Sequence, residues 1–384
     1  MGGTAVQRYV LVTTRFAMRS MIGQDGPTNP SKTDGPPEPT ALPSDRPTAL
    51  VIQTAFLGDV ILTTPLLSVL AGRFGPVDVV TTPAAASLLQ NHPAVGEVLP
   101  YDKKGSARGW RGLRRMGTML RTRGYQRVYL PHRSLRSAAL ALWSGARERI
   151  GFSDSPAAIS YSRRVPRLGS GHEVDRLLAL AGPIAGASPP VTLGLTAADY
   201  QAAEAWLSAH GVGPRFAAIA PGSVWATKRW PYYGELAALL DCPTVIVGGN
   251  EDVALAQAIV ERSEGRALSA AGALSLRQSA ALIQRAHCLV TNDSAPLHLA
   301  TAVGTPIVAL FGPTVPEFGF GPRGPGDVVL GHAELACRPC SRHGPLTCPL
   351  GHHRCLREMS VETVARAVAT VASAEESRAI CPGN

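Results

Sequence analysis

The chain has 384 residues, of which 45% are hydrophobic and 17% charged, a balance typical of globular proteins that excludes a wholly disordered one. Its length is sufficient for two α/β domains, each with a full core. The formal net charge is +9 at pH 7. No apolar run reaches the roughly 18 uncharged residues that a transmembrane helix needs, so no such helix is expected.

Residues 1–48 are expected to be a disordered extension, because residues 25–48 are rich in Pro, Ser, Thr and Asp and show no apolar period. The preceding residues carry three arginines and no acid up to position 23, which fits a short basic membrane contact. The alternative is a translation start assigned too far upstream, with Met18 or Met21 as the true start. No secretory signal is evident, so a cytoplasmic protein with reduced thiols is expected.

Residues 49–186 alternate between strand and helix patterns, which predicts a Rossmann-like domain with a doubly wound parallel sheet. Buried strands are predicted from short apolar runs, and helices from apolar residues at helical spacing. The predicted strands are 49–54, 77–81, 95–99 and 127–131. The predicted helices are one that opens at Gly58, then 83–89, 113–123, 135–144 and 172–185.

Residues 190–358 repeat the alternation after a Gly/Pro-rich linker at 186–190, so a second Rossmann-like domain is predicted. The fold class is therefore α/β with two such halves. The predicted strands are 216–220, 244–247, 288–291 and 307–311, and the predicted helices are 197–210, 232–240, 252–263, 276–285 and 296–303. A Ser-capped helix at 359–375 closes the chain and is expected to pack back on the N-terminal domain.

Two polar turns follow predicted strands of the second domain and carry the chemistry of an anion site. The segment 221–231 gives a Gly/Ser turn and then Lys228 and Arg229, so backbone amides, hydroxyls and cations gather at a strand end. The segment 292–298 repeats the plan after the strand 288–291. Two such turns at strand ends predict a nucleotide-type ligand held in an α/β crevice.

Acidic residues stand at two further strand ends. Asp59 lies where the first strand gives way to a helix; it is either a simple helix cap or a general base towards a hydroxyl nucleophile. Glu251 follows Gly248 and Gly249, where an acid often holds a ribose diol, although these glycines also fit plain turn geometry. The absence of G-x-G-x-x-G after the first strand disfavours a nicotinamide or flavin dehydrogenase.

The positive charge is concentrated between residues 103 and 149, where thirteen lysines and arginines face a single acid, Glu148. This excess indicates an anionic partner such as phosphorylated lipid, a membrane surface or nucleic acid, and a solvated helix face is the alternative. Aromatic residues are too sparse there for a single-strand nucleic-acid platform. The candidate acceptor or membrane contacts are Lys103, Lys104, Arg108, Arg111, Arg114 and Arg115.

Four of the seven cysteines lie close together near the C-terminus with the spacing C-x₂-C-x₇-C-x₆-C. They are Cys337, Cys340, Cys348 and Cys355. Thiolates in such a group are suited to bind a structural Zn²⁺ that cross-links a loop. A metal-free cysteine-rich loop is the open alternative, because the spacing is not that of a standard zinc finger.

The chain resembles the ADP-heptose:lipopolysaccharide heptosyltransferases, glycosyltransferase family 9, from about residue 49 to 372. The resemblance is carried by Leu57-Gly58-Asp59 with Pro65, by Pro221-Gly222-Ser223 leading to Lys228-Arg229-Trp230-Pro231, by Asn292-Asp293-Ser294 leading to His298, and by Gly304-Thr305-Pro306 and Phe311-Gly312-Pro313-Thr314. The cysteine-rich tail resembles that of heptosyltransferase II-like members.

This resemblance implies a GT-B fold with the active site between two Rossmann-like domains. It implies inverting transfer with no required cofactor or metal, from ADP-heptose on the C-terminal domain to a phosphorylated Kdo–lipid A acceptor on the N-terminal domain. The enzyme would be peripheral on the cytoplasmic face of the inner membrane. The implied roles are Asp59 as base, Ser223, Thr227 and Lys228 as donor-phosphate contacts, Glu251 as ribose contact, and Asp293, Ser294, Ala295 and His298 as the second donor loop.

One departure concerns the second donor loop, where members often have Gly and this chain has Ala295 and Pro296. Proline lacks an N–H, so one amide contact to phosphate is absent. The alternatives are a GT-B enzyme with another nucleotide-sugar donor or acceptor, an epimerase acting on a nucleotide-sugar alone, and a non-enzymatic lipid-binding or assembly protein. A nucleic-acid binder is suggested by net charge alone.

Overall fold

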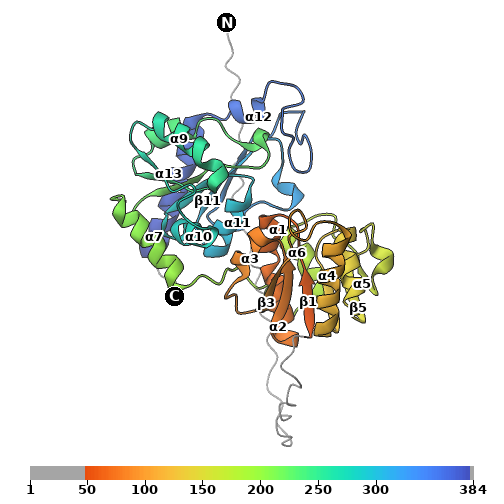
Figure 1. Ribbon diagram of the computed structural model, residues 1–384. Coiled ribbons are helices and arrows are strands. Elements are labelled where there is room, and N and C mark those ends of the chain that lie inside the picture. Colours follow the sequence, from red (N-terminus) through yellow and green to blue (C-terminus); the bar gives the residue numbers. More distant parts are fainter. Residues whose placement is uncertain (1–47, 381–384) are drawn as a thin grey trace, which may run out of the picture.

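The computed structural model describes residues 48–380 and consists of two α/β domains that lie against each other (Figure 1). The predicted disordered extension and its membrane contact lie, apart from Thr48, outside the described residues. The predicted fold class, with two Rossmann-like sheets, is confirmed.

The N-terminal domain is a six-stranded parallel sheet in the order β3-β2-β1-β4-β5-β6. Its central strand β1 is buried at every position because helices cover both faces, as expected for a parallel sheet. The strands are β1 (Ala49–Ile52), β2 (Val77–Thr81), β3 (Val95–Pro100), β4 (Arg127–Leu130), β5 (Glu148–Phe152) and β6 (Arg163–Val165). The helices are α1 (Leu57–Leu62), α2 (Thr64–Phe74), α3 (Pro83–Leu89), α4 (Gly109–Arg123), α5 (Leu135–Trp143) and α6 (Glu173–Leu178).

The C-terminal domain repeats this topology in the order β12-β11-β10-β7-β8-β9, again all parallel. The strands are β7 (Ala217–Ala220), β8 (Thr244–Ile246), β9 (Ala267–Ser269), β10 (Cys288–Asn292), β11 (Ile307–Phe311) and β12 (Val328–Gly331). The helices are α7 (Ala197–Ala209), α8 (Tyr233–Leu239), α9 (Val253–Arg262), α10 (Leu276–Arg285), α11 (Ala295–Val303), α12 (Arg354–Arg357) and α13 (Val361–Ile380). The strand order reverses beside β1 and beside β7, and ligands of doubly wound folds bind at such points.

Four strands, β5, β6, β9 and β12, were not predicted from the sequence. Three of them are sheet edges of three or four residues, too short for an apolar run to stand out. The fourth, β5, begins with the charged residues Glu148 and Arg149, which mask its buried end.

The expectation that the C-terminal helix packs back on the N-terminal domain is wrong. Helix α13 packs on α8 and on β10, β11 and β12 of the C-terminal sheet. The reason is its apolar face, since Val364, Ala367, Val368 and Val371 are buried in a cluster with residues of that sheet.

The helix predicted to open at Gly58 is two helices, α1 and α2, that meet at Thr63. The Thr63 hydroxyl donates to the Asp59 carbonyl oxygen at 2.7 Å. Together the two helices form the stretch Leu57–Phe74, which by length and apolar composition is long enough to cross a membrane. This stretch includes Asp59 and Arg73, and 56% of it is buried inside the protein, where it packs as core helices.

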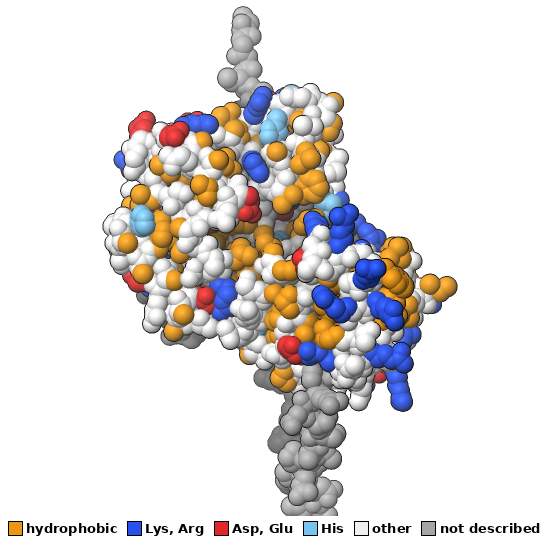
Figure 2. All heavy atoms as spheres, viewed as in Figure 1, with side chains coloured by type: hydrophobic (Ala, Val, Ile, Leu, Met, Phe, Trp, Pro, Cys, Tyr) orange, Lys and Arg blue, Asp and Glu red, His pale blue; other side chains and the backbone are white. Residues whose placement is uncertain are grey.

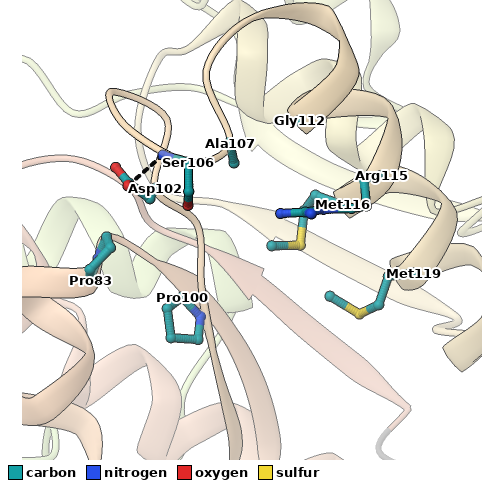
Figure 3. Close-up of a pocket in the computed structure, with 9 residues that line it drawn as sticks. All are labelled: Pro83, Pro100, Asp102, Ser106, Ala107, Gly112, Arg115, Met116 and Met119. Atoms are coloured by element: carbon teal, nitrogen blue, oxygen red, sulfur yellow. Dashed lines mark hydrogen bonds between the residues drawn. The ribbon is translucent and has the colours of Figure 1, made fainter.

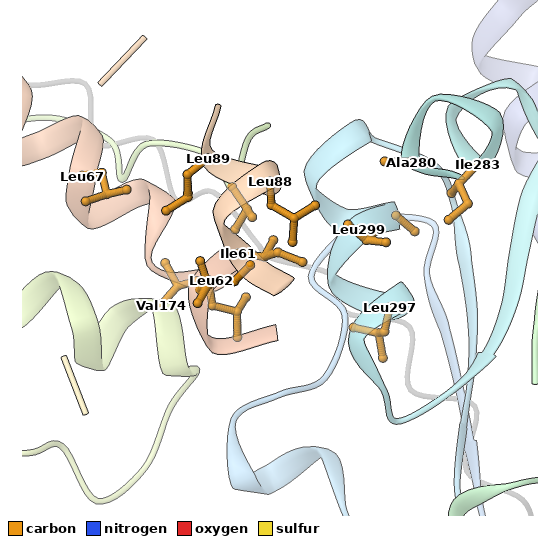
Figure 4. Close-up of a cluster of buried hydrophobic side chains, with 14 of the residues drawn as sticks. Ile61, Leu62, Leu67, Leu88, Leu89, Val174, Ala280, Ile283, Leu297 and Leu299 are labelled. Carbon is orange, nitrogen blue, oxygen red and sulfur yellow. The ribbon is translucent and has the colours of Figure 1, made fainter. Parts of the chain in front are cut away.

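The two domains share part of their core (Figure 4). Leucines of α1, α2 and α3 lie opposite Leu297 and Leu299 of α11 and Ile283 of α10 in one continuous apolar cluster. Beside it, the Arg277 guanidinium forms a buried ion pair with Asp199 at 2.6 Å and donates to carbonyl oxygens of α3 and its C-terminal end. The domain interface is therefore packed along one side, which fixes how the strand ends of the two sheets face each other.

Candidate active site between the two domains

Asp59 lies in the first turn of α1, directly after the carboxyl end of β1. Its carboxylate accepts a hydrogen bond from the Phe56 backbone N–H at 3.1 Å, so Asp59 caps the helix from its third residue, while Phe56 and not Asp59 is the N-cap. Burial, assisted by the negative charge of Glu173, raises the pKa of Asp59 from 3.8 to about 6. A half-buried carboxylate with this pKa is charged at neutral pH and basic enough to accept a proton.

Asp59 is held against the C-terminal domain through its neighbour. A Cβ atom added to Gly58 would lie only 2.6 Å from Cδ2 of His298, so glycine allows α1 and α11 to touch there. His298 is buried, and this burial lowers its pKa to about 4, which keeps the imidazole neutral. The structure thus brings together two predicted site residues, Asp59 and His298, that are far apart in the sequence.

Lys228 and Asp293 form a buried ion pair on the C-terminal side. The Lys228 ammonium donates to a carboxylate oxygen of Asp293 at 2.6 Å and to its backbone carbonyl oxygen at 3.1 Å. The Thr314 hydroxyl donates to the same carboxylate oxygen at 2.7 Å. The two predicted turns therefore meet at the carboxyl ends of β7 and β10, as adjacent parallel strands require.

Three further predicted donor contacts lie in these turns, and a fourth is engaged elsewhere. Ser223 is half-buried, and its hydroxyl accepts from the Trp225 backbone N–H at 3.2 Å. Ser294 is the N-cap of α11 and Ala295 is its first residue, both half-buried. The buried Thr227 instead donates its hydroxyl to the Pro345 carbonyl oxygen, so it holds a neighbouring loop.

Glu251 is exposed in a short 3₁₀ turn, Asn250–Asp252, that follows β8. The adjoining Asp252 lies against the Gly/Ser turn of residues 221–231, the first donor turn, because a Cβ on Gly222 would come within 2.3 Å of its carboxylate. The predicted ribose contact therefore stands beside the Gly/Ser turn, at the same sheet edge.

The predicted basic residues divide into two groups. Lys103 lies beside the carboxyl end of β1, where its ammonium donates to the Thr54 carbonyl oxygen at 2.6 Å. Lys104 and Arg108 are exposed in the loop before α4. Arg111, Arg114 and Arg115 are exposed on α4 itself, and Figure 2 shows lysines and arginines gathered over this domain.

A cavity of about 460 Å³ lies between α4 and the ends of β2 and β3 (Figure 3). Arg115, Met116 and Met119 of α4 line one side, with Pro83 and Pro100 opposite. The Asp102 carboxylate on its rim accepts from the backbone N–H groups of Gly105 and Ser106, both at 2.8 Å. Asp59 and Lys228 are not among its lining residues, so this hollow is separate from the ion pair and the base.

The four clustered cysteines are free thiols. Among residues 48–372, no group of three or more His, Cys, Asp or Glu side chains is arranged to hold a metal ion. The zinc site considered from the sequence is therefore not assembled in this structure, and the cysteine-rich loop is held by other contacts.

Sequence reasoning missed the residue that makes most of those contacts, Arg338. It donates to the carbonyl oxygens of Phe311 at 2.9 Å and Thr314 at 2.8 Å, and also to those of Gly312 and His332. Its place between two cysteines is the one sequence feature that could have drawn attention to it.

A second missed group surrounds Asp59. Glu173, whose charge acts on Asp59, is buried and receives two hydrogen bonds from Arg167 at 2.7 and 2.6 Å. These residues lie more than a hundred positions from Asp59, and nothing in their local pattern signals the contact.

Comparison with protein families and curated proteins gives consistent matches. The family model for glycosyltransferase family 9 (heptosyltransferase) matches residues 113–349. The chain is 28% identical to lipopolysaccharide heptosyltransferase 2 of Escherichia coli (strain K12) over 297 residues, which is 70% of this chain and 84% of that protein. It is 30% identical to lipopolysaccharide heptosyltransferase 1 of Pseudomonas aeruginosa over 314 residues, 76% of this chain and 85% of that protein.

Solved structures agree on the architecture. A glycosyl transferase family 9 protein from Veillonella parvula has a TM-score of 0.76 and 26% identity, covering 87% of this chain and 99% of that one. The E. coli ADP-heptose lps heptosyltransferase II has a TM-score of 0.70 and 23% identity, covering 86% and 99%. The second likeness shows a shared GT-B fold.

Proposed function

The chain belongs to glycosyltransferase family 9, and we propose that it transfers a heptose from ADP-heptose to the phosphorylated inner core of lipopolysaccharide. The observation that carries this proposal is the Gly58–His298 contact, which brings α1, with its carboxylate of raised pKa, against the domain that holds a buried lysine at a strand end. One domain supplies the base and the other the cation, which is the division that a two-substrate transfer needs.

In the proposed reaction, Asp59 takes the proton from an acceptor hydroxyl as its oxygen attacks the anomeric carbon of the donor sugar. The bond from that carbon to the diphosphate oxygen breaks on the opposite face, so the configuration inverts and ADP leaves with the electron pair. Lys228 stabilises the charge that develops on the diphosphate, assisted by backbone amides of the two turns. This cation supports transfer without a metal.

The donor assignment rests on the C-terminal sheet edge. Ser223 and the start of α11, at Ser294 and Ala295, present polar groups and amides beside Lys228, while Glu251 stands where a ribose diol is held. An E. coli heptosyltransferase with ADP shares this fold, with a TM-score of 0.62 and 21% identity over 85% of this chain and 99% of that one. This supports ADP as the nucleotide.

The acceptor assignment rests on the N-terminal domain. Lys103 beside β1 would contact an acceptor phosphate, and the cavity under α4, with Arg115 at its wall, would take a further part of the same phosphorylated glycolipid. Trp110 is 67% exposed at the start of α4 beside Arg111 and Arg114. An exposed aromatic among arginines supports peripheral binding to the anionic cytoplasmic face of the inner membrane.

The proposal is tested by offering the purified protein a panel of nucleotide-sugars with Kdo–lipid A and with its singly heptosylated form. ADP release that requires both ADP-heptose and one of these acceptors supports the function, and the acceptor used identifies the step. Release with another nucleotide-sugar, or without any acceptor, would instead indicate a different transferase or an epimerase. Acceptor binding with no turnover would indicate a lipid-binding protein.

A further inference from the structure

The cysteine loop, residues 333–353, lies over the donor side of the cleft. The Cys340 backbone N–H donates to the Pro313 carbonyl oxygen at 2.9 Å, and the His353 imidazole donates to the Thr227 carbonyl oxygen at 2.7 Å. With the bond from Thr227 to Pro345, these contacts fix both halves of the loop against the end of β11 and the first donor turn.

The middle of this loop touches Lys228. Gly344 has a φ of +81°, and a Cβ there would lie 3.3 Å from Cε of Lys228 and 3.2 Å from Pro313. The backbone turn at Gly344 therefore needs glycine and sets the direction of His343, the residue before it. Partial burial and the positive charges of Lys228 and Arg342 lower the pKa of the His343 imidazole, against the opposing effect of Asp293.

His343 stands between two other aromatic rings that come from different domains. Its ring lies 6.2 Å from that of Trp225, nearly parallel at 18°, and 6.0 Å from that of Phe56. Phe56 is 55% exposed and precedes Asp59 by three residues; Trp225 precedes Lys228 by three residues. The three rings thus form a strip, with His343 in the middle, that links the segment carrying Asp59 to the segment carrying Lys228.

We propose that Phe56, His343 and Trp225 form a binding subsite for the sugar ring that is being transferred. This inference rests on the proposed function, which requires that ring to lie between Asp59 and Lys228. Polarised C–H groups on one face of a pyranose pack favourably on aromatic faces, which carry partial negative charge. Aromatic side chains also exclude water from the anomeric carbon without competing for the diphosphate.

The subsite is tested by calorimetric titration of ADP and of ADP-heptose into the wild type, His343→Ala, His343→Phe and Phe56→Ala. His343→Ala and Phe56→Ala are expected to weaken ADP-heptose binding about tenfold, the scale of one aromatic contact, and to leave ADP binding unchanged. His343→Phe should keep wild-type affinity for both ligands. Leu350→Ala, an exposed leucine on the same loop, is the matched control and should change neither.

Two results would overturn the subsite. One is an equal loss of affinity for ADP and ADP-heptose in His343→Ala, which would mean that the loop acts by holding Lys228. The other is no loss of affinity for either ligand. Titration of the wild type with other nucleotide-sugars as well tests the proposed function separately. If the wild type binds another nucleotide-sugar more tightly, the donor assignment fails while the same comparison with that ligand still judges the subsite. If the wild type binds no nucleotide-sugar more tightly than ADP, both the donor assignment and the sugar subsite are wrong.

Discussion

The Lys228 ammonium lies 2.6 Å from the Asp293 carboxylate, and the two side chains are only 9% and 13% exposed. This pair occupies the place where the donor diphosphate is proposed to bind. The diphosphate must therefore share Lys228 with Asp293, while Thr314 keeps the carboxylate fixed. The lysine is thus held in position before the donor arrives, which favours electrostatic stabilisation of the leaving group.

Replacing Lys228 separates its structural role from its catalytic one. Lys228→Met leaves the Asp293 charge buried and unpaired, so the free energy of unfolding should fall by about 3 kcal/mol and transfer should be lost. The double variant Lys228→Met/Asp293→Asn removes the unpaired charge and should regain most of that stability in urea unfolding. It should not regain transfer; recovered activity would show that the ammonium does not act on the donor.

Asp59→Asn should abolish transfer and leave ADP binding nearly unchanged. Because the pKa of Asp59 is about 6, the wild-type rate should rise with pH through this value as the base loses its proton. The pH–rate profile of the wild type measures this directly. A profile flat from about pH 5 to pH 8 would contradict the assignment of Asp59 as base.

The same carboxyl group links stability to pH. Its pKa rises from an unfolded value near 3.8 to about 6 in the folded chain, so folding favours the protonated form. The stability this provides is present below about pH 4 and is lost as the pH rises to about 6. Asp59→Asn has no carboxyl group to deprotonate, so the variant does not lose this stability as the pH rises. Its melting temperature should therefore exceed that of the wild type at about pH 8 and match it more closely at about pH 4.

Arg277 forms a buried ion pair with Asp199 inside the C-terminal domain, with side chains 8% and 11% exposed, and donates hydrogen bonds to α3 of the N-terminal domain and its C-terminal end. Arg277→Met leaves Asp199 unpaired and removes donors from α3, so the free energy of unfolding should fall by about 3 kcal/mol. The control Arg285→Met breaks an ion pair with Glu204 that is 55% exposed on both sides and should change stability by less than about 1 kcal/mol. An equal fall in the free energy of unfolding for both variants, measured by denaturant titration, would mean that burial of the Arg277 pair does not contribute to stability.

The arginines of α4 should make vesicle binding depend on anionic lipid and on salt. Arg111→Ala/Arg114→Ala should weaken binding to phosphatidylglycerol vesicles about thirtyfold, since each arginine near such a surface contributes about 1 kcal/mol. Arg215→Ala/Arg262→Ala removes the same charge from exposed positions on the C-terminal domain and is the matched control. A comparable loss in that control would attribute binding to net charge alone.

The sequence predicted the central strands and the residues at their ends. Apolar runs such as 216–220 and 307–311 are long enough to be recognised, and the carboxyl ends of adjacent parallel strands must share one edge. That is why Lys228 and Asp293, although 65 positions apart, were assigned to one site and form an ion pair.

The remaining features depend on tertiary contacts that have no local signal. The hydroxyl of Thr227 could not be assigned to Pro345 without the path of the cysteine loop, and the influence of Glu173 on Asp59 arises only when α6 meets α1. The predicted position of α13 was wrong because the apolar residues of a helix do not indicate which of two sheets the helix covers.

The most direct test of heptose transfer by Asp59 is the mass of the glycolipid after incubation with ADP-heptose, for the wild type and for the isosteric Asp59→Asn. The wild type is expected to add one heptose and the variant none, while both proteins bind ADP. No gain with the wild type on either inner-core acceptor, or an equal gain with Asp59→Asn, would contradict it.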